Sequence, residues 1–160
     1  MLIVFNPTAG RRRHRRLNQV VAALQADGAE VTLRATSGAG DATRLAAGAA
    51  AEAFDVVVAA GGDGTANEVA NGLIGTGLPM AVLPLGTANV LAAELGLGDD
   101  PAVLAERIIA GPLQPVHLGI ANGRHFLLMA GVGFDAHVVA EMNPRWKRAL
   151  GKAAYVLKSL

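Results

Sequence analysis

A run of glycines and hydrogen-bonding residues, Gly61-Gly62-Asp63-Gly64-Thr65, stands between a strongly apolar stretch and a segment with helical spacing. Its three glycines let the backbone adopt positive φ angles and come close to a ligand. The amide groups of such a run, with the N-terminus of the helix behind it, can hold phosphate oxygens. Asp63 would be repelled by bare phosphate, so its presence indicates a bridging metal ion or an acceptor hydroxyl nearby. Taken alone, the run favours a plainer interpretation, a tight strand-to-helix turn with Asp63 as the helix cap.

Three other segments also combine glycine with a hydroxyl or amide side chain directly after a strand-like run. They are residues 6–10, 36–40 and 84–87. Ligands of parallel α/β sheets bind beyond the carboxyl ends of the strands. We therefore expect these three segments and the glycine run to form one site.

Beyond Thr65 the run continues as Ala66-Asn67-Glu68-Val69, and the whole string resembles the catalytic domain of diacylglycerol kinases. This family also covers sphingosine kinases, ceramide kinases and the bacterial lipid kinases. Four further segments match its motifs in the same order: NPTAG at 6–10, Thr36 followed by GDA at 40–42, PLGTAN at 84–89 and GVGFDA at 131–136. The chain departs from many bacterial relatives at Val90, where they have Asp. The resemblance spans nearly the whole chain.

This resemblance implies an ATP-dependent lipid kinase that transfers the γ-phosphate of ATP to a hydroxyl of diacylglycerol or a related lipid, with Mg²⁺ as cofactor. The residues implied to line the ATP site are Asn6, Thr8, Gly10, Thr36, Gly62, Asp63, Gly64, Thr65, Asn67, Glu68 and Thr87. Asp63 is the implied catalytic candidate, since it would organise the metal and phosphate or orient the acceptor. The main base is expected beyond Leu160, and no residue is assigned as a metal ligand. From the residues alone, Glu68 could simply favour its helix dipole, and Thr36 and Thr87 could be ordinary N-caps.

The elements that must position these residues alternate along the chain. Strand-like runs cover 2–5, 30–35, 55–60 and 80–83, and helical segments cover 17–24, 41–54, 67–73 and 87–95, with Asp41 as the expected N-cap of the second. This alternation predicts a parallel α/β sheet with helices on both faces. The resemblance makes residues 1–113 a Rossmann-like, phosphofructokinase-like ATP-binding domain.

The pattern changes after Pro112. Strand-like runs at 116–121 and 125–130 flank Asn122-Gly123, a pair typical of tight hairpin turns. We expect residues 114–160 to begin a β-rich second domain, with a mostly helical segment from residue 134. In the family, catalytic and metal-binding acids lie in the remainder of that domain. The resemblance thus predicts a nucleotide-binding fragment that binds ATP but does not complete turnover.

Composition narrows the class of protein further. Hydrophobic residues make up 52% and aromatic residues 4%, so the core must be built from small aliphatic side chains. A net charge of +1 gives no indication of nucleic-acid binding, and the lack of cysteine excludes disulfides and thiolate metal sites. We see no signal peptide and no membrane span. With the resemblance, this predicts a cytoplasmic protein, with peripheral contact at the inner face of the membrane, where its lipid substrate lies.

Five arginines between residues 11 and 16 follow the first of the site segments. They would contact ATP phosphates or anionic lipid headgroups, or else form a solvated first helical turn; both interpretations stay open. Two other functions also remain. The GGDG turn is shared with NAD kinases and phosphofructokinases, so an NAD kinase-like enzyme is one alternative. A non-catalytic nucleotide-binding or membrane-docking module is the other. Asn67-Glu68 and the opening loop favour the lipid kinases.

Overall fold

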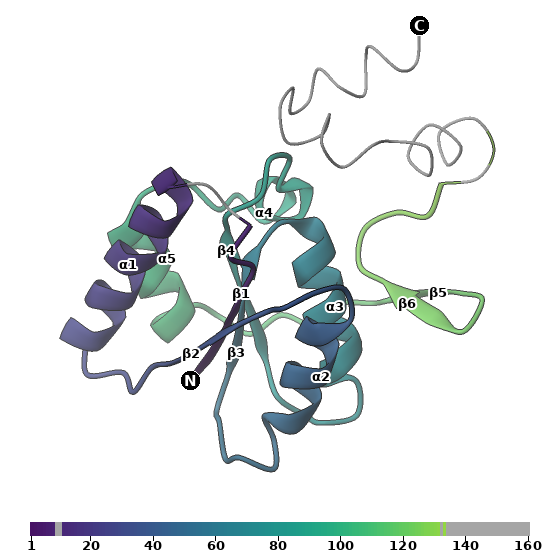
Figure 1. Ribbon diagram of the computed structural model, residues 1–160, viewed down its shortest axis with the longest axis horizontal. Coiled ribbons are helices and arrows are strands. Elements are labelled where there is room, and N and C mark those ends of the chain that lie inside the picture. The colour runs from purple at the N-terminus through teal and green to yellow at the C-terminus, as the bar shows by residue number, and fades with distance from the viewer. Residues whose placement is uncertain (9–10, 132, 134–160) are drawn as a thin grey trace, which may run out of the picture.

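Four short apolar runs of the sequence form one parallel sheet at the centre of the protein (Figure 1). The computed structural model describes residues 1–8, 11–131 and 133. The strands are β1 (Leu2–Phe5), β2 (Thr32–Ala35), β3 (Val57–Gly61) and β4 (Met80–Pro84), in the order β2-β1-β3-β4. The central strands β1 and β3 are buried almost throughout. Strands covered on both faces have nearly continuous apolar sequences, which is why these two were predictable.

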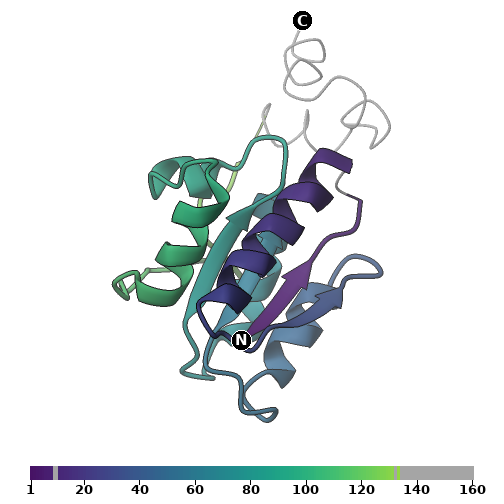
Figure 2. The same cartoon turned by 90° about the vertical axis from the view of Figure 1, so that its left-hand side faces the viewer.

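Helices cover both faces of the sheet, as Figures 1 and 2 show. One face carries α2 (Asp41–Gly48) and α3 (Asp63–Leu73), and the other carries α1 (Arg11–Ala26) and α5 (Pro101–Ala110). Alternate strand residues serve the two cores: Val57 packs with α2 and α3, whereas Val58 packs with α1 and α5. The predicted α/β fold with helices on both faces is confirmed.

Small residues let the helices approach one another closely. A Cβ atom placed on Gly72 of α3 would lie 2.8 Å from the Cβ of Ala46 in α2, far inside normal contact. Ala42 and Ala49 are also fully or almost fully buried in this layer. The low aromatic content therefore reflects tight packing of alanine and glycine between α2 and α3.

The chain then forms a hairpin, β5 (Gly119–Ala121) and β6 (Arg124–Phe126). Its turn residues Asn122 and Gly123 have φ angles of 50° and 74°, the two positive values that a type I′ turn requires. The predicted turn is confirmed, although both strands are shorter than expected. The assignment of residues 114–160 to a second domain stays a prediction, and the helical segment expected from residue 134 lies outside the described residues.

Several predicted helix boundaries were wrong. The helix predicted over 41–54 ends at Gly48, because the chain turns back through Ala53 (φ 59°) to bring Phe54 against the core. Its N-cap is Gly40 in the left-handed region, and Asp41 is already helical. The strand expected from residue 30 begins at Thr32.

Helix starts near the other site segments also differ from expectation. The helix expected over 67–73 begins at Asp63, so the second half of the glycine run is helical. The helix expected over 87–95 is α4 (Val90–Glu94). Helix α5 was not predicted, although Asp100 caps it by accepting hydrogen bonds from Ala102 N (2.8 Å) and Val103 N (3.3 Å).

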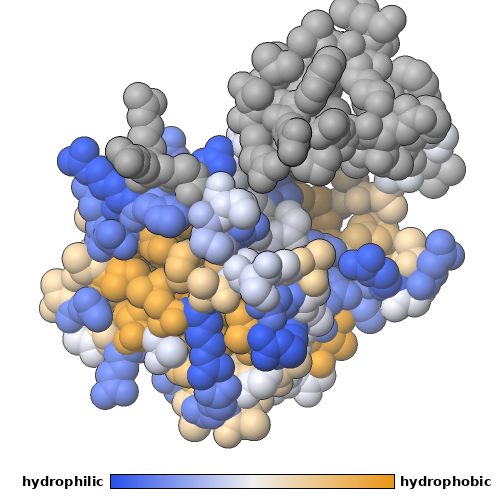
Figure 3. Space-filling view, in the orientation of Figure 1, coloured by the Kyte–Doolittle hydropathy of each residue, from blue (hydrophilic) through white to orange (hydrophobic). Residues whose placement is uncertain are grey.

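Hydrophilic side chains gather over the start of α1, in the upper part of Figure 3. In the lower part of the same view, apolar surface lies between groups of hydrophilic side chains. Among the helices of the described residues, none has the length and apolar character that a membrane crossing requires.

Candidate functional site

The predicted site segments meet along one edge of the sheet. Because all four strands are parallel, residues 36–40, 6–8, 61–65 and 84–89 follow their carboxyl ends in that spatial order. Backbone hydrogen bonds join neighbouring segments: Asn6 N donates to Ala60 O (3.1 Å) and Leu85 N to Gly61 O (2.8 Å). Gly10, a predicted ATP ligand, lies outside the described residues.

The first turn of α3 occupies the middle of this edge. Gly62 is its N-cap in extended conformation, and in the described part of the chain no side chain caps this helix. The amides of Asp63, Gly64 and Thr65 precede the first intrahelical bond, which Ala66 N makes to Gly62 O at 3.1 Å. An uncapped helix start presents amide donors and the positive end of a helix dipole, an arrangement suited to an anion.

Two glycines beside this turn are required by packing. A Cβ on Gly61 would lie 2.6 Å from the Cβ of the buried Thr65. A Cβ on Gly86 would overlap Gly62 Cα and would lie 2.5 Å from Asn89 Oδ1. The β4–α4 loop therefore lies directly against the start of α3.

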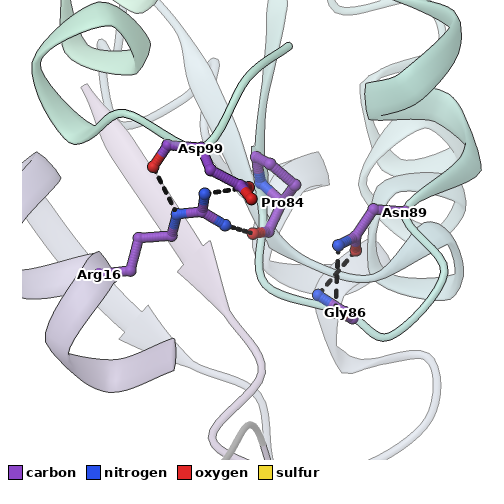
Figure 4. A network of polar contacts seen from close by, with 5 residues as sticks. All are labelled: Arg16, Pro84, Gly86, Asn89 and Asp99. Atoms are coloured by element: carbon purple, nitrogen blue, oxygen red, sulfur yellow. Dashed lines mark hydrogen bonds and ion pairs between the residues drawn. The ribbon is translucent and has the colours of Figure 1, made fainter. Parts of the chain in front are cut away.

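Asn89 holds that loop in place (Figure 4). Its backbone is left-handed (φ 51°). Its side-chain amide makes two hydrogen bonds with Gly86: Oδ1 accepts from Gly86 N at 2.7 Å, and Nδ2 donates to Gly86 O at 3.1 Å. The asparagine that ends the PLGTAN segment thus has a structural role that the sequence did not reveal.

Gly64 differs from these glycines. Its φ is not positive, it is exposed, and a Cβ placed on it would have no atom within 4 Å. Glycine in a helix is less favourable than alanine by up to about 1 kcal/mol. A Cβ here would point toward the N-terminal end of α3, because helical side chains tilt that way. Nothing in the described fold requires glycine at this position. Contact of the backbone with a ligand is a physical reason that would explain the glycine.

The acids of α3 cap neighbouring helices. Asp63 Oδ1 accepts from Leu91 N (3.0 Å), the second residue of α4. Glu68 Oε2 accepts from Ala42 N (3.2 Å), the second residue of α2. Each carboxylate thus lies at the positive end of another helix, where negative charge is stabilising. At this edge α3 starts between α2 and α4, and its side chains cap both neighbours, whereas no side chain of the described residues caps α3 itself.

Asn6 and Thr8 form a compact turn after β1. Asn6 Oδ1 accepts from both Thr8 N (3.0 Å) and Thr8 Oγ1 (2.7 Å). Thr36 follows β2, half-buried, with its amide bonded to Phe5 O at 2.9 Å. These three predicted ligands therefore lie on the β1 and β2 side of the α3 start.

Asp41 lies beyond Thr36 on the same side. Its Oδ2 accepts from the amide and hydroxyl of Ser37 (2.9 and 3.0 Å), and Arg44 donates to its Oδ1. These hydrogen bonds, led by that of the Ser37 amide, lower the pKa of Asp41 below its usual value. The GDA segment thus orders the β2–α2 loop.

On the opposite side, arginines of α1 reach the β4–α4 loop. Arg13 Nη2 donates to Thr87 Oγ1 (3.1 Å), and Arg16 Nη1 donates to Pro84 O (3.1 Å). Arg16 also forms an ion pair with Asp99 (Figure 4). Arg16 therefore joins α1 to the end of β4, and Arg13 contacts a predicted ATP ligand.

Asn67 is placed differently. Its side chain lies one turn beyond Asp63 along α3 and bonds to the backbone at the end of β6: Oδ1 accepts from the amide of Leu127, the residue that follows the strand, at 3.0 Å. The structure therefore does not bring its amide to the α3 start, where Gly62, Gly64 and Thr65 lie.

No cluster of three or more acidic or histidine side chains occurs among the described residues. Asp63 uses one oxygen for α4, and within the described residues Oδ2 has no protein partner. The Asp63 carboxylate therefore fits a metal ion that bridges to a phosphate, but not a metal held by protein side chains alone.

Comparison with known proteins shows the family of the chain. The family model "Diacylglycerol kinase catalytic domain" matches residues 1–121. The chain is 39% identical to the diacylglycerol kinase of Bacillus subtilis (strain 168), covering 99% of this chain and 54% of that protein. It is 40% identical to "Probable lipid kinase YegS-like" of Pseudomonas aeruginosa (strain UCBPP-PA14), covering 100% of this chain and 52% of that protein.

A solved structure is also similar. The structure titled "Crystal structure of a putative diacylglycerol kinase from Bacillus anthracis str. Sterne" matches with a TM-score of 0.69 at 30% identity, over 89% of this chain and 52% of that one. The chain thus spans about half the length of the curated relatives it matches. The match to the family model over residues 1–121 and the identity along almost the full chain show that this protein belongs to the diacylglycerol kinase catalytic domain family.

Proposed function

We propose that the chain carries the nucleotide-binding part of an ATP-dependent lipid kinase. In this proposal the γ-phosphate of ATP passes to a hydroxyl of diacylglycerol or a related lipid. The observation that supports it most directly is the uncapped start of α3 with an exposed Gly64 that packing does not require. That feature lies in the glycine run that the family shares, at the edge of the sheet where ligands of such folds bind.

The phosphate oxygens would accept hydrogen bonds from the first-turn amides, those of Asp63, Gly64 and Thr65. Thr87 adds a hydroxyl from the neighbouring loop. Because its oxygen already accepts from Arg13, the Thr87 proton is available to donate to an anion. The Arg13 guanidinium adds positive charge beside that loop. Asn6, Thr8 and Thr36 would border the nucleotide on the other side, with Gly10 as a further predicted contact.

Glu68 would serve this site indirectly. Its carboxylate holds the start of α2 against α3, which fixes the loop that contains Thr36. Asp63 would act through two oxygens: Oδ1 fixes α4, and Oδ2 would be the oxygen available to a metal ion that carries the phosphates. When bound, Mg²⁺ supplies positive charge that neutralises the phosphates during transfer.

The lipid acceptor needs a base that takes its proton. Among the described residues Asp63 is the candidate within the site, and we propose that the main base lies outside the described part. A lipid acceptor also requires the protein to work at a membrane surface, so we propose a cytoplasmic protein with peripheral contact at the inner face of the membrane. The arginines near the start of α1 are the candidate contacts for anionic lipids.

A transfer assay with three acceptors tests this function. This chain, together with the part of the second domain proposed to carry the main base, is incubated with MgATP labelled at the γ-phosphate and with diacylglycerol, sphingosine or NAD. Label in diacylglycerol or sphingosine is the expected result, and label in NAD alone would overturn the proposal. The relatives found are named for diacylglycerol and lipids, and give no support to the NAD kinase-like alternative. Nucleotide binding without transfer to any acceptor would favour a binding module.

A further inference from the structure

Strand β6 lies between β5 and helix α3, with hydrogen-bonding partners on both sides. On one side Ile120 of β5 lies opposite His125 in antiparallel register. On the other side, two asparagine side chains of α3 bond to its backbone and to that of Leu127, the residue that follows it. Asn71 Nδ2 donates to His125 O (3.0 Å), and Asn71 Oδ1 accepts from His125 N (3.2 Å). Asn67 Oδ1 accepts from Leu127 N (3.0 Å).

The spacing of the two asparagines fits the spacing of a strand. Asn67 and Asn71 are one helical turn apart and therefore share one face of α3. His125 and Leu127 are two residues apart, so their amides point to the same edge of the strand. A carboxamide carries both a donor and an acceptor, as a peptide group does. The two side chains thus bind the free edge of β6 much as a neighbouring strand would.

Apolar packing accompanies these polar contacts. Leu127 and Leu128, which follow β6, lie against the core cluster that contains Val69 and Leu73 of α3. Asn71 Nδ2 also donates to Asn67 O (2.8 Å), which orients the second amide against its own helix. The contact is therefore a built interface between the hairpin and α3.

We infer that Asn67 and Asn71 form a docking pair that fixes the β5–β6 hairpin to α3, the helix whose first turn is the proposed phosphate site. Asn67 is thereby a positioning residue and does not bind ATP. Its acceptor oxygen is occupied by Leu127 N, and its Nδ2 lies 3.4 Å from His125 O. Its Cα lies about 6 Å further along the helix axis than that of Asp63, at 1.5 Å per residue.

This assignment has a consequence for the proposed function. The hairpin begins the part of the chain predicted to belong to the second domain, and α3 carries the glycine run. A rigid helix that binds the hairpin and carries the glycine run holds the two in one fixed relation. The Asn67-Glu68 pair of the family motif would then have a structural role, since Asn67 binds α3 to the hairpin and Glu68 binds α3 to α2.

Amide hydrogen exchange measured by NMR on this chain tests the docking pair. In Asn67→Ala the Leu127 amide should exchange roughly 3- to 10-fold faster, and in Asn71→Ala the His125 amide should do so. Amides of β3, such as Val58, should keep their protection in both variants and serve as the control for general destabilisation. Unchanged protection of Leu127 in Asn67→Ala, or of His125 in Asn71→Ala, would overturn the inference.

A conservative pair of variants covers the case in which an alanine variant does not fold. Asn67→Asp loses the long contact of Nδ2 with His125 O (3.4 Å) but keeps the oxygen that accepts from Leu127 N, so Leu127 should stay protected. Asn71→Asp replaces the donor to His125 O by a carboxylate oxygen, so the hairpin should detach and the exchange of His125 should rise. Equal behaviour of the two aspartate variants would contradict the assigned hydrogen bonds.

Nucleotide affinity separates this inference from the proposed function. MgATP titrations should give the same Kd, within about twofold, for Asn67→Ala and Asn71→Ala. A loss of affinity of about tenfold or more in Asn67→Ala alone would make Asn67 a ligand and overturn the inference. If the unchanged chain binds no MgATP, the proposed nucleotide site fails, while the exchange experiment still decides whether the docking pair exists.

Discussion

Gly64→Ala should make the protein more stable and weaken its binding of ATP. The two effects have opposite signs because Gly64 lies in the first turn of α3, where alanine is the better helix former, but faces the space in front of the helix start. A substitution that merely damaged the fold would lower both quantities. The position therefore separates a structural role from a binding role.

The size of each effect follows from the contacts. A Cβ at residue 64 meets no atom within 4 Å, so there is no steric cost to subtract from the helix-forming gain. That gain is about 0.5–1 kcal/mol, which in a chain of this length raises Tm by about 1–4 °C. A methyl group among the first-turn amides keeps a phosphate oxygen from at least one of them. Loss of one hydrogen bond to a charged group costs about 1.5–3 kcal/mol, or a 10- to 150-fold higher Kd.

The assay combines thermal unfolding without nucleotide and calorimetric titration with MgATP. Gly98→Ala is the matched control, because a Cβ there also meets no atom within 4 Å and its φ is not positive. It should leave the Kd for MgATP unchanged. Gly86→Ala is the opposite control, because its Cβ would lie 2.5 Å from Asn89 Oδ1, and it should lower Tm. If Gly64→Ala binds MgATP as tightly as the unchanged chain, the phosphates do not lie at the start of α3.

Three further outcomes are expected. Asp63→Ala should lower the free energy of unfolding by about 1 kcal/mol because α4 loses its cap. Asp63→Asn keeps an oxygen that can accept from Leu91 N, so its free energy of unfolding should fall by less. Equal losses of the two variants in denaturant titrations would contradict the role of Asp63 as a cap. Arg16→Ala should lower the free energy of unfolding by about 1–3 kcal/mol, because the hydrogen bond to Pro84 O is lost. Arg15→Ala, at an exposed neighbouring position, should change the free energy of unfolding by less than about 0.5 kcal/mol. Since hydrogen bonds lower the pKa of Asp41 in the folded state, its stabilising contribution is present above the unfolded pKa of about 3.9 and disappears as pH falls through the lower, folded pKa. The unfolding free energies of the unchanged chain and Asp41→Asn should therefore differ at pH 6 and converge below about pH 4, and a constant difference would refute this.

The sheet could be predicted from the sequence because burial on both faces leaves a local signature. Residues 57–60 are all buried, so every side chain of that run is apolar, and no knowledge of distant residues is needed to recognise it. The Asn122-Gly123 turn was predictable for the same reason, since two positive φ angles are a local requirement. Boundaries failed where tertiary packing decided them: alanine favours helix through residues 50–53, but Phe54 must return to the core.

The sequence predicted that the four site segments meet at one edge of the sheet, and they do, but the role of each side chain depends on residues far away. Asp63 bonds to a residue 28 positions later, and Glu68 to one 26 positions earlier. No local pattern distinguishes an acid that caps its own helix from one that caps another. The same holds for Asn67, whose partner Leu127 is 60 residues away.

The glycine run therefore combines residues with different physical requirements. Gly61 has no space for a side chain because Thr65 packs on it, and Gly62 lies against Gly86. Gly64 has space, lies in a helix, and is the residue for which the fold offers no reason. Where packing fully explains a motif residue, a ligand is not needed to account for it. The strength of the phosphate-site proposal thus depends on Gly64 and the uncapped amides around it more than on the whole GGDGT string.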